Sequence, residues 1–384
     1  MKSEWKNVTL AAVADFNPRE TLLKGKLAKK IPMDILQSFC RKIPAYCEEI
    51  YKGGTKFRNG DTLMARITPC LENGKTSRVD ILEDGEVGFG STEYIVFRAK
   101  EGVLDSHFLY YLVRSDIVRE PAIKSMVGSS GRQRVQTDVL EKLCIRLPSL
   151  STQRKIAAVL SSLDDKIETN NAICRNLEDQ ADALFNKCIE EGNMQVPFLS
   201  LVEVQGGGTP KTGQSEYWSG EIPFFTPKDV SIPFTFETGK SLTREGLAHC
   251  NSPLYPAWTT FVTARGTVGK LAMAGLPMAM NQSCYALVGK KIHPILAFMY
   301  SRSVVHSLKK KSTGSVFDAI VTRDFETENV KRLSDERKFI DVALPMYERI
   351  YIFMRENNRL AALRDTLLPR LMSGELDVSA VKLD

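Results

Sequence analysis

Apolar side chains recur every three or four residues along a segment in the middle of the chain, which is the spacing of one face of an α-helix. The stripe continues for more than four heptads, which favours a coiled-coil helix over the alternative of an ordinary core helix. Pro148 precedes the stripe, Ser149 or Ser151 can cap its helix, and Gly192 follows its end, so we expect a long helix within residues 148–192. The stripe comprises Ile156, Leu160, Leu163, Ile167, Asn170, Cys174, Leu177, Ala181, Leu184 and Cys188.

A second stripe of the same kind lies within residues 334–384. Pro345 is expected to delay the start of its helix and Pro369 to kink its last turn, while Arg364 stands where the first stripe has Ala181. The second helix should therefore be the shorter one. Its stripe comprises Phe339, Ala343, Met346, Ile350, Phe353, Asn357, Leu360, Leu367 and Leu371.

Neither stripe is sufficient to stabilise a helix alone, so we expect the two helices to pack against each other as an antiparallel coiled coil. Asn170 within the first stripe can fix the register at some cost in stability. A helix of about 35 residues would be roughly 50 Å long at 1.5 Å per residue. The expected coiled-coil and subunit interface comprises Ile156, Leu160, Leu163, Ile167, Asn170, Leu177, Leu184, Ile350, Phe353, Leu360, Leu367 and Leu371.

The two stripes belong to a longer internal repeat. Residues 152–156 (TQRKI) reappear as residues 335–339 (DERKF), an offset of 183, and Gly131 pairs with Gly314 at the same offset. The offset grows toward the front of each copy, where the matching pairs are Tyr94 with Tyr285 (offset 191) and Arg66 with Arg265 (offset 199). A repeat of this length predicts two copies of a globular domain followed by a helix, with internal pseudo-twofold symmetry.

The globular parts mix strand-like and helix-like segments. Residues 94–97 and 258–262 are rich in β-branched and aromatic side chains, whereas residues 104–119 and 295–311 have helical patterns. The expected fold class is therefore α/β (α+β), with two globular domains separated by the two long helices. The predicted boundaries are a first domain at 1–147, a central helix at 148–192, a second domain at 193–333 and a C-terminal helix at 334–384.

The composition is that of a folded, water-soluble chain. The 384 residues are 43% hydrophobic and 26% charged, no apolar run approaches the ~20 residues of a membrane-spanning helix, and the first residues lack a signal-peptide pattern. We therefore expect a cytoplasmic protein with no membrane partner. The net charge of +6 is concentrated in two segments: residues 1–150 carry 24 basic and 19 acidic side chains, and residues 193–333 carry 15 and 10. Two basic domains on near-neutral helices suit DNA as a partner, although such an excess is also common in other proteins.

The usual catalytic and metal-binding motifs are missing. The eight cysteines form no C-x-x-C pair and the four histidines form no H-E-x-x-H motif, so we expect reduced thiols and no metal site. The sequence Gly74-Lys75-Thr76 lacks the upstream glycine of a phosphate loop, because Pro69 stands there. No catalytic residue is therefore predicted.

Loops of Gly, Ser, Thr, Asn, Gln, Arg and Lys occur in both halves. These residue types contact base edges and phosphates in protein–DNA complexes, although most such clusters are simply turns. The candidate DNA-binding residues of the first domain are Arg66, Lys75, Arg132, Gln133 and Arg134, and those of the second are Thr209, Lys211, Lys228, Arg265, Thr267, Asn281 and Gln282. Asn281 and Gln282 have an equally plausible alternative role as a buried structural pair.

Taken together, these features resemble the specificity (S) subunit of type I restriction-modification systems. The resemblance is carried by residues 147–156 (LPSLSTQRKI) and 176–185 of the central helix, and by residues 363–371 (LRDTLLPRL) with 373–375 (SGE). Residues 208–210 (GTP) with Tyr217-Trp218 resemble the entry to one kind of target-recognition domain, and residues 68–76 and 131–135 resemble another kind. One departure is Glu336, which stands where the first half has Gln153.

The resemblance implies two target-recognition domains that each read half of a bipartite double-stranded DNA target, with the coiled coil as spacer. It also implies two modification subunits, which carry S-adenosylmethionine and methylate adenine at N6, and restriction subunits that use ATP and Mg and are reached through the modification complex. The specificity chain itself then binds no cofactor and is not catalytic. The alternatives are a coiled-coil scaffold without sequence-specific DNA binding and a DNA-modifying enzyme with unrecognised motifs.

Overall fold

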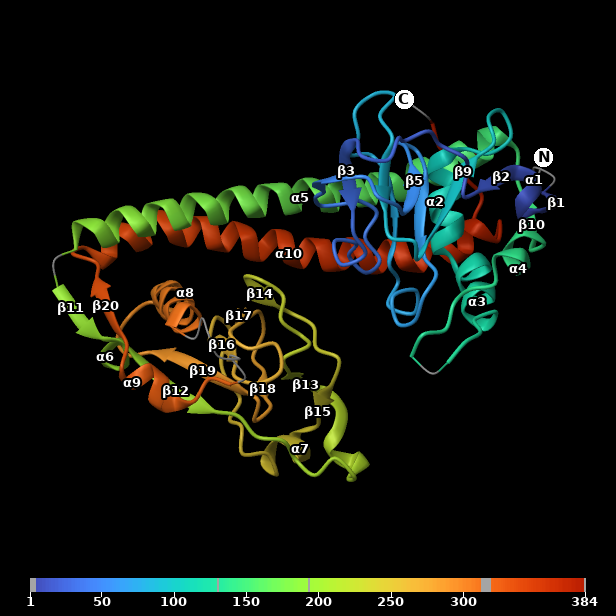
Figure 1. Cartoon of the computed structure of the whole chain (residues 1–384). Coiled ribbons are helices and arrows are strands. Elements are labelled where there is room, and N and C mark those ends of the chain that lie inside the picture. The colour runs from blue at the N-terminus through green and yellow to red at the C-terminus, as the bar shows by residue number, and fades with distance from the viewer. Residues whose placement is uncertain (1–4, 130, 193, 312–318, 383–384) are drawn as a thin grey trace. The chain divides into compact units, whose positions relative to one another are not determined.

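The computed structural model of the chain describes residues 5–129, 131–192, 194–311 and 319–382; Gly314, which was paired above with Gly131, lies outside them. The structure divides into two units, Met1–Thr169 with Asn358–Asp384 and Asn170–Asn357. Each unit combines one globular domain with part of each long helix (Figure 1). Each also has its own hydrophobic core.

The first unit contains a two-stranded sheet and two four-stranded sheets, whose strand orders are β1-β10, β2-β9-β6-β7 and β4-β3-β8-β5. Its elements are β1 (Lys6–Thr9), α1 (Leu10–Val13), β2 (Ala14–Phe16), β3 (Leu27–Ile31), β4 (Cys47–Ile50), β5 (Thr55–Phe57), β6 (Thr62–Ala65), β7 (Thr76–Arg78), β8 (Gly88–Gly90), β9 (Tyr94–Ala99), α2 (Ser106–Arg114), α3 (Asp116–Lys124), α4 (Thr137–Glu141) and β10 (Cys144–Leu147). It also includes the first part of α5 (Leu150–Glu191) and the last part of α10 (Glu336–Met372).

The second unit contains a five-stranded sheet of order β12-β19-β16-β17-β14 and two smaller sheets of orders β11-β20 and β15-β13-β18. Its elements are β11 (Met194–Pro197), α6 (Phe198–Leu201), β12 (Val202–Gly206), the 3₁₀ turn η1 (Ser215–Tyr217), β13 (Trp218–Phe225), β14 (Phe234–Thr235), β15 (Ser241–Leu242), α7 (Arg244–Ala248), β16 (Thr260–Thr263), β17 (Leu271–Ala274), β18 (Ala279–Met280), β19 (Cys284–Gly289), α8 (Pro294–Lys311), α9 (Thr322–Glu326) and β20 (Asn329–Arg332).

The same order of elements occurs in both units, which confirms the predicted mixed fold class and the internal repeat. The sheet β2-β9-β6-β7 of the first unit returns as β12-β19-β16-β17 in the second. Strand β1 pairs with β10 in the same antiparallel manner as β11 pairs with β20. In each globular domain the first strand therefore pairs with the last strand, and this last strand directly precedes a long helix.

Backbone pairing corrects the predicted repeat alignment by one residue. Ala65 pairs with Tyr94 across β6 and β9, and Thr263 pairs with Cys284 across β16 and β19. Ala65 therefore corresponds to Thr263 and Tyr94 to Cys284, so the offsets are 198 (from 65 to 263) and 190 (from 94 to 284) instead of 199 and 191.

The corrected alignment matches Arg66 with Ala264 and not with Arg265. Side chains alternate between the two faces of an extended segment, so a slip of one residue moves a side chain to the opposite face. The pairing of Arg66 with Arg265 from sequence was wrong for this reason, and the two arginines face different surroundings.

Two predicted elements need correction. The helix expected at 104–119 is two helices, α2 and α3, because Ser115 adopts an extended conformation between them and its hydroxyl donates to Leu112 O at 2.7 Å. The strand expected at 258–262 begins only at Thr260, because Trp258 has a φ of +71°. The helix expected at 295–311 is α8.

The first long helix begins and ends as expected. The Ser149 hydroxyl accepts a hydrogen bond from Thr152 N–H at 3.3 Å just before α5, and Gly192 follows its last residue. Helix α5 has 42 residues and α10 has 37, so the second helix is the shorter one. Helix α10 begins at Glu336, however, so the expectation that Pro345 delays its start was wrong.

The interior position of Pro345 is offset by packing. A proline removes one hydrogen bond from a helix, but the fully buried Ala343 and Tyr347 flank it and anchor this part of α10 in the core. The helix also continues beyond Pro369 to Met372.

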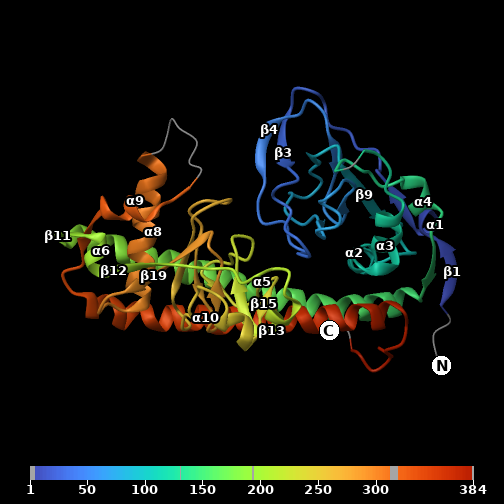
Figure 2. The ribbon, with the colours of Figure 1, turned by 90° about the horizontal axis from the view of Figure 1, so that it is seen from below.

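The long helices pack antiparallel within each unit (Figures 1 and 2). In the second unit Phe185 of α5 packs edge-on against Phe339 of α10 and also against Tyr300 of α8, with ring centroids 5.6 and 5.4 Å apart. In the first unit Ile156 and Leu371 belong to the same buried cluster. The predicted antiparallel helix pair is thus confirmed.

On α5 the buried stripe is shifted by one residue from the predicted one at two positions. Asp164 and Phe185 are buried, whereas Leu163 and Leu184 are only partly buried. The reason is that each helix packs against a globular domain as well as against the other helix, so its buried face turns away from a simple heptad line. Five other predicted interface residues are also partly buried: Ile167, Leu177, Phe353, Leu360 and Leu367.

A polar layer crosses the helix pair in the second unit. Asn170, which is fully buried, donates to Asn357 Oδ1 at 2.9 Å and to Glu356 Oε2 at 2.8 Å. Asn357 in turn donates to Asn171 Oδ1 at 2.8 Å. The expected role of Asn170 in fixing the register is consistent with this network, because an apolar partner would leave these amides unsatisfied.

The start of α5 is joined to the first domain by Gln153, which is 1% exposed. Its amide nitrogen donates to Val103 O at 3.1 Å and to Pro148 O at 2.9 Å, and its oxygen accepts from Asp105 N–H at 2.9 Å. Its counterpart Glu336 forms an ion pair with Arg332 instead. The sequence difference at this repeated position therefore reflects two different ways of anchoring a helix start.

Burial raises the pKa of Glu178 on α5 to about 7; Asp182 and Asp179 raise it further, and Arg302 opposes the rise. A carboxyl whose pKa is higher in the folded state destabilises the fold as pH rises from about 4.5 toward 7, because the unfolded chain loses its proton first. We expect Glu178→Gln to remove this loss and to be more stable than the parent chain by about 1–2 kcal/mol at pH 8, a value reduced for partial solvent exposure. Thermal unfolding at pH 5 and pH 8 measures the difference.

The matched control for this prediction is Glu190→Gln, which changes an exposed carboxyl on the same helix. Its melting temperature should follow the parent chain at both pH values. A Glu178→Gln variant with the same pH dependence as the parent would contradict the prediction.

Candidate nucleic-acid interface

The loops that carry the candidate DNA-binding residues meet at one edge of the main sheet in each domain. Strand β6 ends at Ala65 beside Tyr94, the first residue of β9, and β16 ends at Thr263 beside Cys284, the first residue of β19. The loops after β6 and β16 therefore lie next to the loops before β9 and β19. The structure brings together segments that are far apart in the sequence.

In the second domain, hydrogen bonds connect these loops in pairs. The loop after β12 joins the loop before β19, where Gly208 N–H donates to Met280 O at 3.0 Å. The loop after β16 joins the loop after β13, where the Thr267 hydroxyl donates to Pro227 O at 3.4 Å. Ala264 N–H after β16 also donates to Ser283 O before β19 at 2.8 Å, which links the two pairs of loops.

Glycine is required at 207 and 208 by close backbone approach. A Cβ atom on Gly207 would lie 2.2 Å from Asn281 O, and one on Gly208 would lie 2.8 Å from Asn251 N. The approach places Thr209 against the loop before β19, where its hydroxyl donates to the Gln282 side chain. This Gly-rich segment is therefore a turn, as the alternative interpretation held, and it also positions candidate side chains.

Three cations extend from these second-domain loops. Lys211, Lys228 and Arg265 are exposed, and no hydrogen bond or ion pair to the described part of the chain engages their side chains. Thr267 and Gln282 are exposed beside them. This arrangement is suited to contacts with a polyanion.

Asn281 has a structural role in the same cluster. It is partly buried, and its side-chain oxygen accepts from Ser283 N–H at 3.0 Å, which forms the turn into β19. Gln282 is exposed, so the two residues do not form a buried pair.

In the first domain, two candidate cations are directed toward their own domain. The Arg66 guanidinium donates to Val135 O at 3.2 Å, and the Lys75 amine donates to Met33 O at 2.7 Å. Both side chains are partly buried and connect loops. The structure therefore gives both side chains a role in connecting loops, and their contact with DNA stays a prediction.

The other three candidates lie on the loop between α3 and α4. Arg132 is exposed, whereas Gln133 is partly buried and its N–H donates to Thr68 Oγ1 at 3.0 Å. Arg134 is exposed and forms an ion pair with Glu93, the residue before β9. Glu93 was not among the predicted residues, because an acidic side chain is not one of the types that directly contact base edges and phosphates in the candidate loops.

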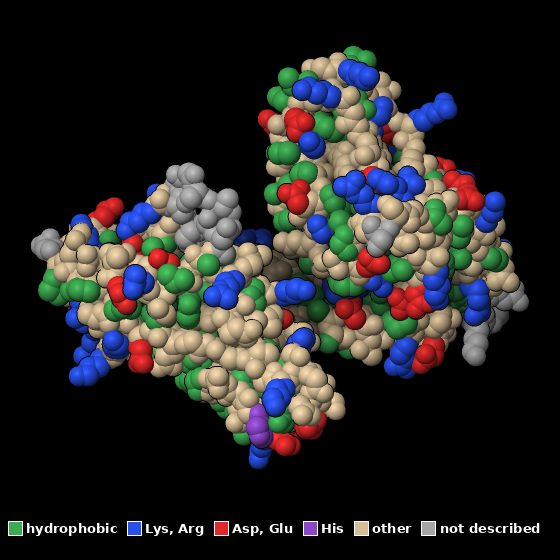
Figure 3. Space-filling model, turned by 60° about the horizontal axis from the view of Figure 1, so that its bottom comes forward, with side chains coloured by type: hydrophobic (Ala, Val, Ile, Leu, Met, Phe, Trp, Pro, Cys, Tyr) green, Lys and Arg blue, Asp and Glu red, His purple; other side chains and the backbone are tan. Residues whose placement is uncertain are grey.

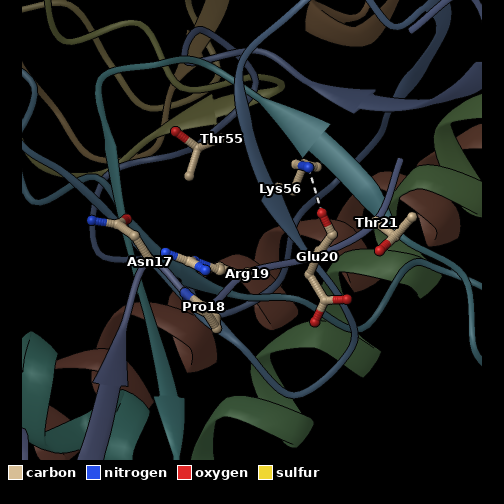
Figure 4. A pocket seen from close by; sticks show the side chains of 7 residues that line it. All are labelled: Asn17, Pro18, Arg19, Glu20, Thr21, Thr55 and Lys56. Carbon is tan, nitrogen blue, oxygen red and sulfur yellow. Dashed lines mark hydrogen bonds between the residues drawn. The ribbon is translucent and has the colours of Figure 1, made fainter. Parts of the chain in front are cut away.

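A shallow hollow of about 530 Å³ lies elsewhere in the first domain, between the loop after β2 and strand β5 (Figure 4). The Lys56 amine donates to Glu20 O within it. Burial alone would raise the pKa of the Glu20 carboxyl, but hydrogen bonds from Arg98 and Arg58 lower it. These contacts fix the loop. The hollow is lined by Asn17, Pro18, Arg19, Glu20, Thr21, Thr55 and Lys56.

Charge on the surface is mixed. On the face shown in Figure 3, Lys and Arg side chains are spread over both units with Asp and Glu side chains among them. On a mixed surface of this kind, the positions of individual Lys and Arg side chains on the loops indicate where a polyanion would bind better than the net charge of a domain does.

Among the described residues, no group of three or more His, Cys, Asp and Glu side chains is arranged to hold a metal ion, and the eight cysteines are free thiols. In the described ranges, no helix combines the length and the apolar character needed to cross a bilayer.

The chain belongs to the type I restriction-modification DNA specificity family. The family profile described as "Type I restriction modification DNA specificity domain" matches residues 2–179 and 191–331, which is most of the chain. The resemblance inferred from the helical motifs is confirmed by this match. By family, specificity subunits are the non-catalytic components of type I restriction-modification enzymes.

Individual relatives support this assignment. The chain is 24% identical over 411 residues to the type I restriction enzyme HindI specificity subunit of Haemophilus influenzae, covering 83% of this chain and 87% of the relative. It is 31% identical over 173 residues to the EcoAI specificity subunit of Escherichia coli, covering 43% and 29%. The crystal structure of a type I restriction-modification system S subunit from M. genitalium has the same fold, with a TM-score of 0.59, 15% identity and 96% of both chains covered.

Proposed function

We propose that this chain is the sequence-specificity subunit of a type I restriction-modification enzyme and that it binds a bipartite DNA target, with one half-site contacted by each globular domain. The observation that carries the proposal is the repeated loop cluster at the same edge of the main sheet in both domains, with exposed cations on each. In the second domain these are Lys211, Lys228 and Arg265, and in the first they are Arg132 and Arg134. Two such readers in one chain would multiply discrimination, because each mismatched base pair costs about 1–3 kcal/mol.

The helix pair would act as the spacer between the half-sites and as the surface that recruits partners. A 42-residue helix is about 63 Å long at 1.5 Å per residue, which exceeds one turn of DNA. The partners would be two modification subunits, which bind S-adenosylmethionine and methylate adenine at N6, and restriction subunits that use ATP and Mg. The chain would act in the cytoplasm and bind no cofactor itself.

Methylation mapping tests the proposal. The chain is co-expressed with its cognate modification subunit, and the host genome is sequenced for N6-methyladenine. We expect a bipartite motif with a gap of fixed length, of which one half changes when residues 1–147 are exchanged for those of a relative and the other half changes when residues 197–330 are exchanged. A stable complex that methylates no motif would instead favour a scaffold without sequence-specific binding, and methylation by the chain alone would favour an enzyme.

A further inference from the structure

The residue before β9 and the residue before β19 occupy the same place in the repeated fold. Glu93 N–H donates to Ser91 Oγ at 3.1 Å, and Ser283 N–H donates to Asn281 Oδ1 at 3.0 Å, so the same side-chain turn precedes both strands. The carbonyl of Glu93 accepts from Arg66 N–H at 2.9 Å, as that of Ser283 accepts from Ala264 N–H at 2.8 Å. Glu93 in the first domain is therefore the counterpart of Ser283 in the second.

The residue that binds Glu93 also has a counterpart. Arg134 forms a β-bridge with Ile67 in the first domain, and Ala319 forms the corresponding bridge with Arg265 in the second. The residue that follows makes the same backbone hydrogen bond in both domains. Val135 N–H donates to Arg66 O and Ile320 N–H donates to Ala264 O, each at 2.9 Å. Arg134 therefore corresponds to Ala319.

This comparison shows that the fold does not require the charged pair. The same backbone hydrogen bonds and β-bridge form beside Glu93 and Arg134 in one domain and beside Ser283 and Ala319 in the other. The pair is thus an addition specific to the first domain, at the loop cluster where the proposed function places DNA.

The pair has a defined geometry. Arg134 Nε lies 3.0 Å from both carboxylate oxygens of Glu93, and Arg134 Nη2 lies 2.6 Å from Glu93 Oε1. The backbone of Arg134 is held on its other side by Val127, with hydrogen bonds of 2.9 and 3.1 Å. The carboxylate binds the side of the guanidinium formed by Nε and Nη2. Nη1 and the second N–H of Nη2, which together form the outer end of the guanidinium, make no hydrogen bond to the described residues, and 46% of the Arg134 side chain is exposed.

A guanidinium held in this way is better suited to reading a base than to binding a phosphate. The carboxylate cancels most of its charge and would repel a nearby phosphate, so the pair contributes little to non-specific attraction. The two N–H groups at the free end are parallel and fixed in direction, which matches the N7 and O6 acceptors of guanine in the major groove.

We propose that Arg134, held in orientation by the positioning residue Glu93, reads one guanine in the half-site of the first domain. This inference rests on the proposed function, since it requires that the loop cluster of the first domain contacts DNA. It assigns base specificity to a residue pair that has no charged counterpart in the second domain.

The experiment compares binding of the complex with its modification subunit to duplexes that carry the mapped motif or a single base change at each position. We expect Arg134→Ala to reduce discrimination at one G·C position of the first half-site by about 10- to 100-fold while the other positions keep theirs. Glu93→Ser should weaken discrimination at the same position, because the guanidinium is then free to rotate. Both substitutions introduce a residue type that the second domain has at the same place, which favours correct folding.

Two further variants make the result decisive. Arg134→Lys keeps the charge but lacks the two parallel donors, so it should lose the same base preference even if Arg134→Ala folds poorly. Arg132→Ala removes an exposed cation two residues away and should weaken binding to all duplexes equally. Unchanged preferences in the Arg134 and Glu93 variants, or an equal weakening at all positions, would overturn the inference and leave the proposed function intact. The absence of any motif for the parent complex would instead refute the proposed function.

Discussion

Replacing Arg364 with leucine is expected to destabilise the first unit by about 3–5 kcal/mol. Arg364 lies on α10, its side chain is 6% exposed, and its guanidinium donates to the 4% exposed carboxylate of Asp164 on α5 at 2.5 Å. Asp164 also accepts from the Tyr111 hydroxyl of α2 at 2.6 Å. Loss of the arginine would leave a buried carboxylate with one neutral donor, and this uncompensated charge accounts for most of the expected cost.

A double substitution distinguishes this explanation from simple loss of packing. In Asp164→Leu/Arg364→Leu no buried charge is left without its partner, so the double variant should be at least about 2 kcal/mol more stable than the sum of the two single effects predicts. Hydrogen exchange of peptides from residues 150–169 and 358–372 measures the stability of this unit separately from the other. Arg359→Leu, an exposed site on α10, should change it by no more than about 0.5 kcal/mol. Single and double variants that are equally unstable would contradict the electrostatic account.

The ion pair also explains why sequence periodicity describes the helices only in part. Ile156, Leu160 and Ile350 are fully or almost fully buried, as their spacing predicts, because a helix with a continuous apolar stripe must cover it. Arg364 interrupts the second stripe at the position where the first stripe has Ala181. It is nevertheless buried, because Asp164, one residue outside the predicted stripe, and the neighbouring Asp365 form ion pairs with it. Periodicity detects apolar contacts and has no means of matching two charges on separate helices.

The loop cluster was predictable in composition but not in detail. The Gly, Thr, Asn and Arg content of the loops indicated the segments that the structure brings to one sheet edge. The directions of individual side chains depend on hydrogen-bond register, and a slip of one residue gave Arg66 the place of Arg265. Glu93 was not predicted, because the sequence does not show its contact with Arg134.

Removing the three exposed cations of the second-domain loops is expected to weaken DNA binding strongly and without regard to sequence. The variant Lys211→Ala/Lys228→Ala/Arg265→Ala deletes three positive side chains that protrude from adjoining loops. If each neutralises one phosphate, the slope of log K against log salt should become less negative by roughly 0.9 per contact, or about 2.7 in total. Affinity at physiological salt should then fall by a factor on the order of 100.

Fluorescence anisotropy of the complex with its modification subunit, measured between about 50 and 200 mM salt, gives both quantities. The control variant Lys187→Ala/Lys291→Ala/Lys331→Ala removes the same charge from exposed positions outside these loops and should keep a slope close to that of the parent. Equal slopes for the two triple variants would mean that net charge, and not the loop cluster, attracts the DNA. A loss of discrimination at particular base pairs in the loop variant would show that at least one of its three cations reads bases, since loss of a phosphate contact weakens all sequences alike.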